Sequence, residues 1–429
     1  MILIKNGRVV DAKSNTDGIL DVVIDGGKIK TIGKVEDDGS YEQVIDADGC
    51  VVAPGLIDVH VHFRDPGQTQ KEDVLTGAAA AAAGGYATVI CMANTVPTCD
   101  TPEIIRYVTD KAKDCPVQVL QAGSVTKGLK GQELTDFDAL LEAGAPCLTD
   151  DGINLTSAAL CRTAMVEAAK RGTLLSFHEE EPSLVPSPGV NYGSEAAKHF
   201  GVPGAMASAE SAMIGRDIAL ALDTGARVLF QHVSSAQSVA LIRAGKAMGA
   251  KIYAEVTPHH LSLTEDDVPA HGTYARMNPP LRKEADRQAL IAALADGTID
   301  MIATDHAPHT VAEKARGLAG SAMGIVGLET AFPLLYKYLV LKGVITLEKL
   351  IALMSVNPRR IFALEGGVEE GDAADFTVLD LGAEYAVDPG MFLSKGRATP
   401  FAGWKVQGRA VLTVVGGKEV YDDNYESNR

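Results

Sequence analysis

Short apolar runs alternate with helix-like segments along most of this chain. From Pro54-Gly55 onward, the runs are followed by longer stretches such as 157–171 and 235–248. This alternation predicts parallel βαβ units. We expect eight strands, at Leu56–His62, Ala87–Asn94, Val117–Gly123, Pro146–Asp151, Thr173–His178, Arg227–His232, Lys251–Thr257 and Asp300–Asp305. Eight strand–helix repeats over about 300 residues predict a (β/α)8 TIM barrel.

The two ends of the chain have a different pattern. Short strand-like runs separated by turns rich in Gly, Asp and Asn fill the first 53 residues, which is typical of a small antiparallel sheet. After the helical pattern ends, Asp375–Leu381 and Ala410–Val415 again have the composition of strands. We therefore expect an α/β protein in which residues 1–53 and 366–429 together form a small β domain beside a catalytic barrel at 54–365.

Polar residues gather where the predicted barrel strands end. These residues are His60, His62, Asn94, Asp151, His178, His232 and Asp305. The carboxyl-terminal rim of a barrel holds the active site, so we expect these side chains to converge there. Imidazoles and carboxylates without cysteine suit a divalent metal such as zinc.

The first predicted strand shows the pattern most clearly. Apolar residues alternate with His60 and His62, which places these two side chains and Arg64 on one face. The turn residues Asp65-Pro66-Gly67 then end the strand. A guanidinium on the same face as two metal ligands would bind a substrate carboxylate as a fork.

The carboxylates suggest the chemistry. Asp151 is the candidate bridge between two metals, whereas Asp150 would face the other way on a strand. A metal-bound water becomes a hydroxide near neutral pH and can attack a polarised carbonyl. Asp305 can be both metal ligand and general acid–base. The residues therefore predict a metal-dependent hydrolase acting on an amide-like bond of a small anionic substrate.

Charge and composition indicate which classes of binding partner and which cellular compartment to expect. The 429 residues include 39 Lys and Arg against 56 Asp and Glu, so the net charge of −17 argues against nucleic acid and anionic membranes. The six cysteines have no CxxC spacing and indicate buried thiols of a reducing compartment. No stretch has the length of a membrane span, and the amino-terminal residues lack the apolar region of a signal peptide. We expect a cytoplasmic protein.

Five segments together resemble the signatures of the bacterial type I dihydroorotases, a branch of the amidohydrolase superfamily. They are His60–Gly67, Met92–Thr95, Leu148–Gly152, Arg276–Arg282 and Thr304–His309. The similarity extends over nearly the whole chain, including Gly371–Asp375. It implies reversible interconversion of N-carbamoyl-L-aspartate and L-dihydroorotate in pyrimidine (UMP) biosynthesis.

The resemblance also implies a metal site with one or two zinc ions per subunit. On that basis His60, His62 and Asp305 hold one zinc, and His178 and His232 hold the other. Asp151 bridges them where much of the superfamily has a carbamylated lysine. Hydroxide on the metals then attacks the ring amide carbonyl, and Asp305 carries the proton to the leaving nitrogen.

Substrate contacts follow from the same likeness. Arg64, Asn94 and His309 would hold the α-carboxylate, with His62 beside them, while Asn278 and the backbone near Met323 and Gly324 would orient the ring. The glycine-rich stretch after His309 is expected to be a mobile loop that covers the site. Ala93 and Ala322-Met323 depart from the family pattern, where Pro and Pro-Phe are expected, but neither change removes a metal ligand.

Other functions stay open at this stage. Hydantoinase and allantoinase are related cyclic-amide hydrolases, but simple hydantoins have no carboxylate for Arg64, and the missing bridging lysine argues against both. A catalytically silent scaffold for aspartate transcarbamoylase is an alternative of another class, and association with that enzyme could also coexist with catalysis. A homodimer is the expected assembly. Manganese or cobalt could replace zinc.

Overall fold

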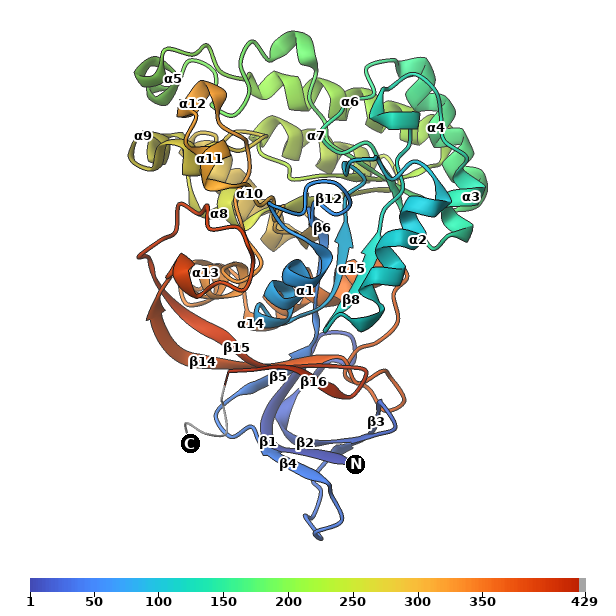
Figure 1. Ribbon diagram of the computed structural model, residues 1–429, viewed down its shortest axis with the longest axis vertical. Coiled ribbons are helices and arrows are strands. Elements are labelled where there is room, and N and C mark those ends of the chain that lie inside the picture. Colours follow the sequence, from blue (N-terminus) through green and yellow to red (C-terminus); the bar gives the residue numbers. More distant parts are fainter. Residues whose placement is uncertain (424–429) are drawn as a thin grey trace.

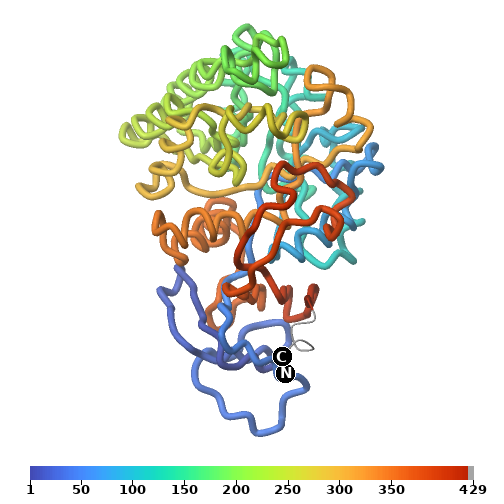
Figure 2. Tube along the Cα trace, turned by 90° about the vertical axis from the view of Figure 1, so that its left-hand side faces the viewer, coloured from blue at the N-terminus to red at the C-terminus, as the bar shows by residue number. Residues whose placement is uncertain are grey.

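The computed structural model describes residues 1–423 and contains a helix-rich barrel above a β-sheet (Figure 1). The turned view separates the same two parts, with the first strands at the lower end (Figure 2). The end of the predicted carboxyl-terminal part, 424–429, lies outside the described residues. Among the helices of residues 1–423, none combines the length and the apolar character needed to cross a membrane.

Eight parallel strands form the barrel, as the apolar runs predict. They are β6 (Leu56–Val61), β7 (Tyr86–Cys91), β8 (Gln118–Gln121), β9 (Leu148–Thr149), β10 (Leu174–Phe177), β11 (Arg227–Phe230), β12 (Ile252–Val256) and β13 (Met301–Ile302). They pair in the orders β6-β7-β8 and β13-β12-β11-β10-β9. Parallel bridges Gly123–Leu148 and Val61–His306 join the two sheets and close the barrel. His60 lies within β6, whereas the other polar residues expected at the strand tips follow the last strand residue by one to three positions: His62, Asn94, Asp151, His178, His232 and Asp305.

Helices follow the strands around the outside of the barrel (Figure 1). The longer ones are α1 (Val74–Ala83), α2 (Pro102–Lys111), α4 (Ala158–Arg171), α6 (Ala207–Thr224), α7 (Ala236–Ala247) and α10 (Glu284–Asp296). Shorter ones are α3 (Phe137–Glu142), α5 (Glu195–Phe200), α8 (Pro258–Ser262), α9 (Val268–His271), α11 (Val311–Lys314), α12 (Gly317–Gly320), α13 (Ala331–Leu335), α14 (Leu347–Ile351) and α15 (Asn357–Ile361). Helix α4 shows why they form: Ser157 caps its first turn, Gly172 ends it in a left-handed conformation, and its buried residues recur at helical spacing.

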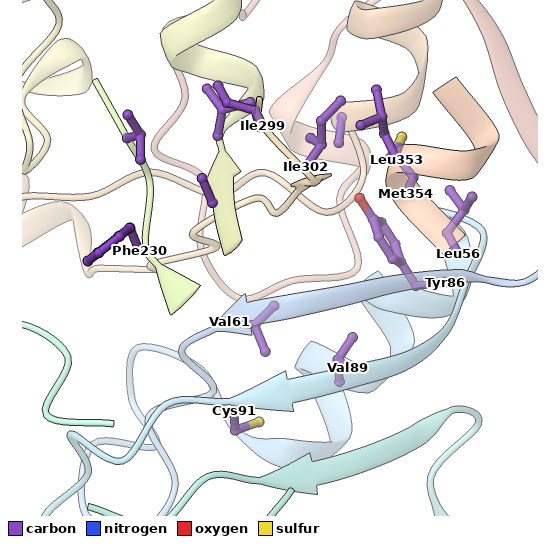
Figure 3. Close-up of a cluster of buried hydrophobic side chains, with 14 of the residues drawn as sticks. Leu56, Val61, Tyr86, Val89, Cys91, Phe230, Ile299, Ile302, Leu353 and Met354 are labelled. Atoms are coloured by element: carbon purple, nitrogen blue, oxygen red, sulfur yellow. The ribbon is translucent and has the colours of Figure 1, made fainter. Parts of the chain in front are cut away.

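The barrel is held together by two apolar layers. Between strands and helices, Val61, Val89 and Cys91 project from β6 and β7, and the Tyr86 ring extends toward Leu353 and Met354 (Figure 3). A separate cluster joins strands across the barrel, including Ile57, Ile90, Leu229 and Met301, together with Ile361 and Phe362 at the end of α15. Each such side chain contributes about 1.5–3 kcal/mol on burial, so the rim residues rest on a rigid support.

Both ends of the described chain build one eight-stranded sheet, as expected. The sheet is mixed and not wholly antiparallel as the turn pattern suggests, because its first strand pairs in parallel with the two strands that precede the barrel. Its strands are β1 (Ile2–Asp11), β2 (Thr16–Asp25), β3 (Lys28–Gly33), β4 (Gln43–Asp46), β5 (Val51–Pro54), β14 (Phe376–Ala386), β15 (Lys405–Val415) and β16 (Lys418–Asp422). The order is β16-β15-β14-β5-β1-β2-β3, with β4 also paired to β1. The joint between the two chain ends is the antiparallel pair β5–β14, from Val51–Leu379 to Pro54–Phe376. The predicted domain boundaries themselves stay a prediction.

Candidate metal centre and active site

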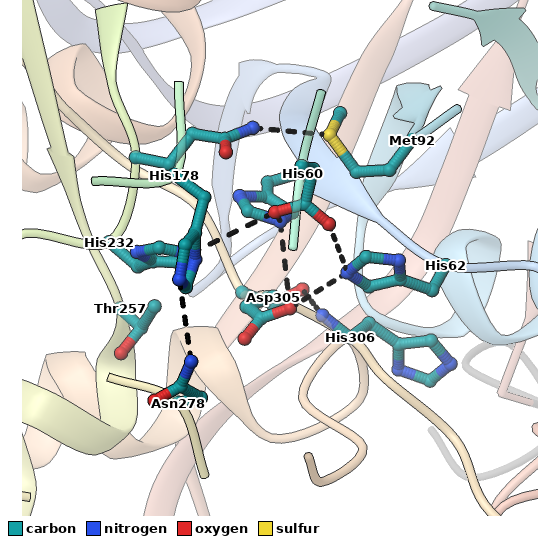
Figure 4. A network of polar contacts seen from close by, with 12 residues as sticks. His60, His62, Met92, His178, His232, Thr257, Asn278, Asp305 and His306 are labelled. Carbon is teal, nitrogen blue, oxygen red and sulfur yellow. Dashed lines mark hydrogen bonds and ion pairs between the residues drawn. The ribbon is translucent and has the colours of Figure 1, made fainter. Parts of the chain in front are cut away.

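Six candidate metal ligands meet at the carboxyl ends of the barrel strands (Figure 4). They are His60, His62, Asp151, His178, His232 and Asp305, and each is buried, with at most 8% of its surface exposed. All of them except Asp151 are labelled in Figure 4. They come from the ends of β6, β9, β10, β11 and β13, which lie far apart in sequence. The structure therefore brings together the set expected from the sequence.

One half of the cluster contains His60, His62 and two carboxylates. Nε2 of His62 lies 3.0 Å from Oδ1 of Asp305 and 3.6 Å from Oδ2 of Asp151. Nε2 of His60 lies 3.4 Å from Oδ1 of Asp151 and 3.6 Å from Oδ1 of Asp305. Both imidazoles thus direct the same ring atom at the same pair of carboxylates.

The other half contains His178 and His232. Nδ1 of His178 lies 2.9 Å from Nε2 of His232, which in turn lies 3.9 Å from Oδ1 of Asp151. Potential ligand atoms of His60, His62 and Asp151 lie within 4.8 Å of one another, and so do those of Asp151, His178 and His232. Asp151 is the residue common to both groups.

These residues fit a divalent cation. Nε2 of His60 is buried and has no hydrogen-bond partner within residues 1–423, although it points toward two carboxylates. A buried, unpaired ring nitrogen beside carboxylates is what a metal ligand set needs. Burial opposes ionisation of Asp151, but the His60, His62 and His178 rings lower the pKa of its carboxyl well below the usual range, which keeps it an anion. The arrangement can therefore hold a metal cofactor.

Three site residues have an unusual backbone. Arg64, His232 and Asp305 adopt positive φ angles of 59°, 33° and 49°. Left-handed backbone at a non-glycine residue costs of order 1–3 kcal/mol and persists where the surroundings impose it. It also corrects one expectation: β6 ends at Val61, so Arg64 reaches the site through this turn and not by strand alternation with His60 and His62.

The residue after Arg64 explains how the turn is held. Asp65 is buried and accepts hydrogen bonds from Lys111 Nζ at 2.5 Å and Tyr107 Oη at 3.1 Å. Both donors come from α2, so a helix on the outside of the barrel fixes the loop that presents Arg64.

A cavity of about 360 Å³ opens next to the cluster. Its lining includes all the residues expected to bind substrate: His62, Arg64, Asn94, Asn278, His309, Met323 and Gly324. Asn94, however, is engaged at both ends of its amide, since Oδ1 lies 3.0 Å from His62 Nδ1 and Nδ2 donates to Asp151 at 2.9 Å. Asn94 therefore orients two candidate metal ligands in addition to lining the cavity.

Arg64 and His309 differ in charge. Nε2 of His309 lies 2.7 Å from the Met323 carbonyl and 3.3 Å from Nη2 of Arg64. Because the carbonyl can only accept, Nε2–H donates to it and the Arg64 contact is a packing contact. Burial, followed by the charge of Arg64, lowers the pKa of His309 to about 3, so this ring is neutral. Among the residues that line the cavity, Arg64 supplies the permanent positive charge.

The stretch after His309 contains two short helices, α11 and α12, before it returns to the cavity at Ala322–Gly324. Lys314 Nζ donates to the carbonyls of Ala322 and Gly324 at 3.0 and 2.9 Å. Glu313 forms an ion pair with Lys71 at 2.9 Å. These contacts hold the segment over the site in this structure, and its mobility stays a prediction.

Asp150 behaves as the strand pattern suggests. It turns away from the cluster and accepts hydrogen bonds from the backbone of Val125 and Thr126. His306, next to Asp305, is fully buried beside Glu72 and Phe63 and packs away from the cluster (Figure 4).

Two buried carboxylates near the ligands were not expected from the sequence. Glu255 of β12 lies 2.6 Å from Nδ1 of His60, and Glu180 accepts from Nδ2 of Asn278 at 2.9 Å. The sequence does contain a clue to the role of Glu255, because a charged residue inside the apolar run Ile252–Val256 needs a buried partner. Glu180 lies in a loop after His178, where the sequence pattern gives no comparable clue.

Comparisons with known proteins point to one family. The dihydro-orotase-like family profile matches residues 49–238. A dihydroorotase of Clostridioides difficile strain 630 is 49% identical over 98% of this chain and 100% of its own length. One of Clostridium acetobutylicum is 46% identical over 99% of this chain and 100% of its own.

Solved structures of other proteins superpose on this chain over nearly its full length. The L-hydantoinase of Arthrobacter aurescens superposes with a TM-score of 0.88 at 26% identity, covering 98% of this chain and 96% of that one. The dihydropyrimidinase of Brevibacillus agri superposes with a TM-score of 0.84 at 23% identity, covering 98% and 95%. At that identity the second likeness supports the barrel and sheet alone.

Proposed function

Because this chain belongs to the dihydroorotase family, we propose that it catalyses the reversible ring closure of N-carbamoyl-L-aspartate to L-dihydroorotate in pyrimidine biosynthesis. The observation that supports this substrate best is Arg64, a guanidinium that lines the cavity beside the metal cluster and has no carboxylate partner within residues 1–423. A substrate with its own carboxylate supplies that partner.

We further propose that the metal is zinc and that two ions bind. His60, His62 and Asp305 would hold one, His178 and His232 the other, with Asp151 between them. When bound, zinc polarises a carbonyl and lowers the pKa of a coordinated water, which provides a nucleophile near neutral pH. The shared position of Asp151 supports the two-ion arrangement over a single ion.

The chain's own residues then orient the substrate. Arg64 binds the α-carboxylate, and the neutral His309 ring fixes the Met323 carbonyl at the edge of the cavity. Asn278, held through its amide nitrogen by Glu180, presents its unpaired carbonyl oxygen toward the ring. Such fixed contacts hold the reacting carbonyl next to the carboxylate cluster.

Asp305 is the proposed acid–base group. In hydrolysis, water adds to the ring carbonyl that arises from the side-chain carboxyl, and the bond from this carbon to the adjacent ring nitrogen breaks. Asp305, which lines the cavity, accepts the proton of the water and delivers it to the leaving nitrogen. Ring closure reverses these steps, and one water is released.

The related hydantoinase and allantoinase activities are less favoured, because the full-length relatives at 46–49% identity are dihydroorotases. The homodimer, an association with aspartate transcarbamoylase and a cytoplasmic location stay proposals from the sequence.

The testing experiment is turnover of L-dihydroorotate, hydantoin and allantoin by protein of measured metal content. We expect dihydroorotate to be hydrolysed preferentially, with activity lost on chelation and restored by zinc. Absence of turnover of all three by fully metallated protein would favour a scaffold role. A preference for hydantoin or allantoin would refute the assignment of Arg64.

A further inference from the structure

Glu255 is a fully buried carboxylate that no step of the proposed reaction uses. It lies in β12 between the apolar neighbours Ala254 and Val256, with 0% of its surface exposed. A carboxylate in such surroundings is unfavourable unless it is paired and hydrogen-bonded. Its partners therefore indicate why it is there.

The first partner is the His60 ring. Oε1 of Glu255 lies 2.6 Å from Nδ1, a distance typical of a charge-assisted hydrogen bond. Because a carboxylate only accepts, Nδ1 must be protonated, and Nε2 is the atom left facing Asp151 and Asp305. Glu255 thus selects the tautomer and the ring rotation that make His60 a ligand.

The second partner is the backbone of His232. The same oxygen, Oε1, accepts from the His232 backbone N–H at 3.2 Å. The main-chain carbonyl of Glu255 accepts from the next residue, Val233, at 2.9 Å. His232 is one of the residues with left-handed backbone, at φ 33°, so these two bonds hold a conformation that the residue would otherwise leave.

We propose that Glu255 is a positioning residue that fixes one ligand in each half of the metal centre through a single carboxylate oxygen. His60 belongs to the half with His62, and His232 to the half with His178. Glu255 therefore sets the two halves relative to each other as well as orienting one ring. This inference rests on the proposed metal centre and deepens it.

Glu180 provides a natural contrast. Its Oε2 lies 3.7 Å from Nε2 of His178 and accepts from Asn278, and its backbone N–H bonds to Asn154. Within residues 1–423, Glu180 forms no hydrogen bond with His60 or His232. Loss of Glu180 should affect one half of the centre, whereas loss of Glu255 should affect both.

The experiment compares Glu255→Leu, Glu255→Gln and Glu180→Gln with wild type. Each metal-free, folded protein is titrated with zinc against a chelator, and with Co²⁺ while its visible absorption bands are recorded. We expect Glu255→Leu to weaken every zinc bound by wild type by about 10- to 100-fold and to shift the Co²⁺ bands. Glu255→Gln, which keeps an oxygen acceptor for Nδ1–H, should lose less than the leucine variant, and Glu180→Gln should weaken one zinc only.

Asp300→Asn is the matched control. Asp300 is largely buried, pairs with Lys246 at 2.6 Å, and accepts from the backbone of Ala254, the residue before Glu255. The Asp300→Asn substitution removes a charge next to the same strand and does not touch a candidate ligand. Zinc affinity and the Co²⁺ spectrum should therefore stay as in wild type.

Wild-type affinity and an unchanged Co²⁺ spectrum in folded Glu255→Leu would overturn the proposal. If that variant does not fold, Glu255→Ala takes its place, since it also removes both carboxylate oxygens and an unchanged zinc affinity and spectrum there have the same meaning. Weakening of a single zinc by Glu255→Leu would overturn the link between the halves. A wild-type protein that binds neither metal would instead overturn the proposed function, and this result appears before any variant is compared.

Discussion

Replacing Arg64 by Met should separate substrate binding from the rest of the active site. Met keeps an apolar chain of similar length but removes the positive charge. In this structure the guanidinium makes two long contacts, to the Pro308 carbonyl at 3.4 Å and to His309 at 3.3 Å. Within residues 1–423 no carboxylate lies within ion-pair distance of it, so its main partner should be the substrate.

The size of the effect follows from that geometry. Removing one side of a buried, hydrogen-bonded charge pair costs about 2–5 kcal/mol, which corresponds to a loss of roughly 30- to 5,000-fold in kcat/KM. In the free protein, by contrast, replacing Arg64 should be stabilising. Burial lowers the pKa of Arg64, because the cation is unfavourable there, so its removal should raise the melting temperature of the free protein.

The assay uses two substrates that differ only in the carboxylate. Dihydrouracil has the ring of dihydroorotate without that group, so the rate of its hydrolysis reports the site with Arg64 unpaired. We expect Arg64→Met to lower kcat/KM for dihydroorotate by the factor above and to leave that for dihydrouracil within a few fold. Arg64→Lys should fall between wild type and Met, since lysine keeps the charge but loses the two-pronged contact.

An equal loss for both substrates would refute this reasoning, because the role of Arg64 would then be structural. Full activity of Arg64→Met on dihydroorotate would also refute this reasoning. Asn94 and His309 would then be the residues that bind the substrate carboxylate. A fall in melting temperature would show that Arg64 stabilises its loop, contrary to the argument from burial.

Three further predictions concern the catalyst, the metal and pH. Asp305→Asn should reduce turnover by at least about 10²-fold with circular dichroism unchanged; near-wild-type activity would remove Asp305 from the acid–base role. Removing metal with a chelator should abolish activity and lower the melting temperature, and zinc should restore both, because a metal held only by the folded state stabilises it; an unchanged melting temperature would argue against a bound metal. Burial raises the pKa of Glu329 from 4.5 to about 7, so the folded protein retains a proton that the unfolded chain releases, and this stabilising contribution is lost as pH rises from about 4.5 through 7. Glu329→Gln should therefore melt a few degrees above wild type at pH 8 and close to it at pH 5, and a gap independent of pH would contradict the raised pKa.

Much of this architecture is visible in the sequence because it depends on local pattern. The eight apolar runs predict the barrel strands, and the polar residues at the ends of these runs predict which side chains share the rim. His178 and His232 are 54 residues apart, yet the strands that they follow pair in parallel, and this brings Nδ1 of His178 within 2.9 Å of Nε2 of His232. The strand pattern was sufficient for that.

Contacts that depend on three-dimensional register were not predictable. The left-handed turn at Arg64 arises from tertiary contacts of Asp65 with α2, which no pattern near residue 64 encodes. The double engagement of Asn94 and the pairing of Glu255 with His60 join residues on separate strands. Such contacts follow from the closed barrel, and the sequence leaves their partners undetermined.

The pairing of β5 with β14 has a consequence for how the protein is made. On the ribosome β5 is complete at Pro54, but its second neighbour begins only at Phe376. At about 5–20 residues per second, roughly 15–65 s pass between these points. During that interval the nascent chain exposes an unpaired strand edge of Val51-Val52-Ala53, which is the kind of surface that aggregates. Translation speed and chaperone capacity in the host should therefore affect the yield of this enzyme.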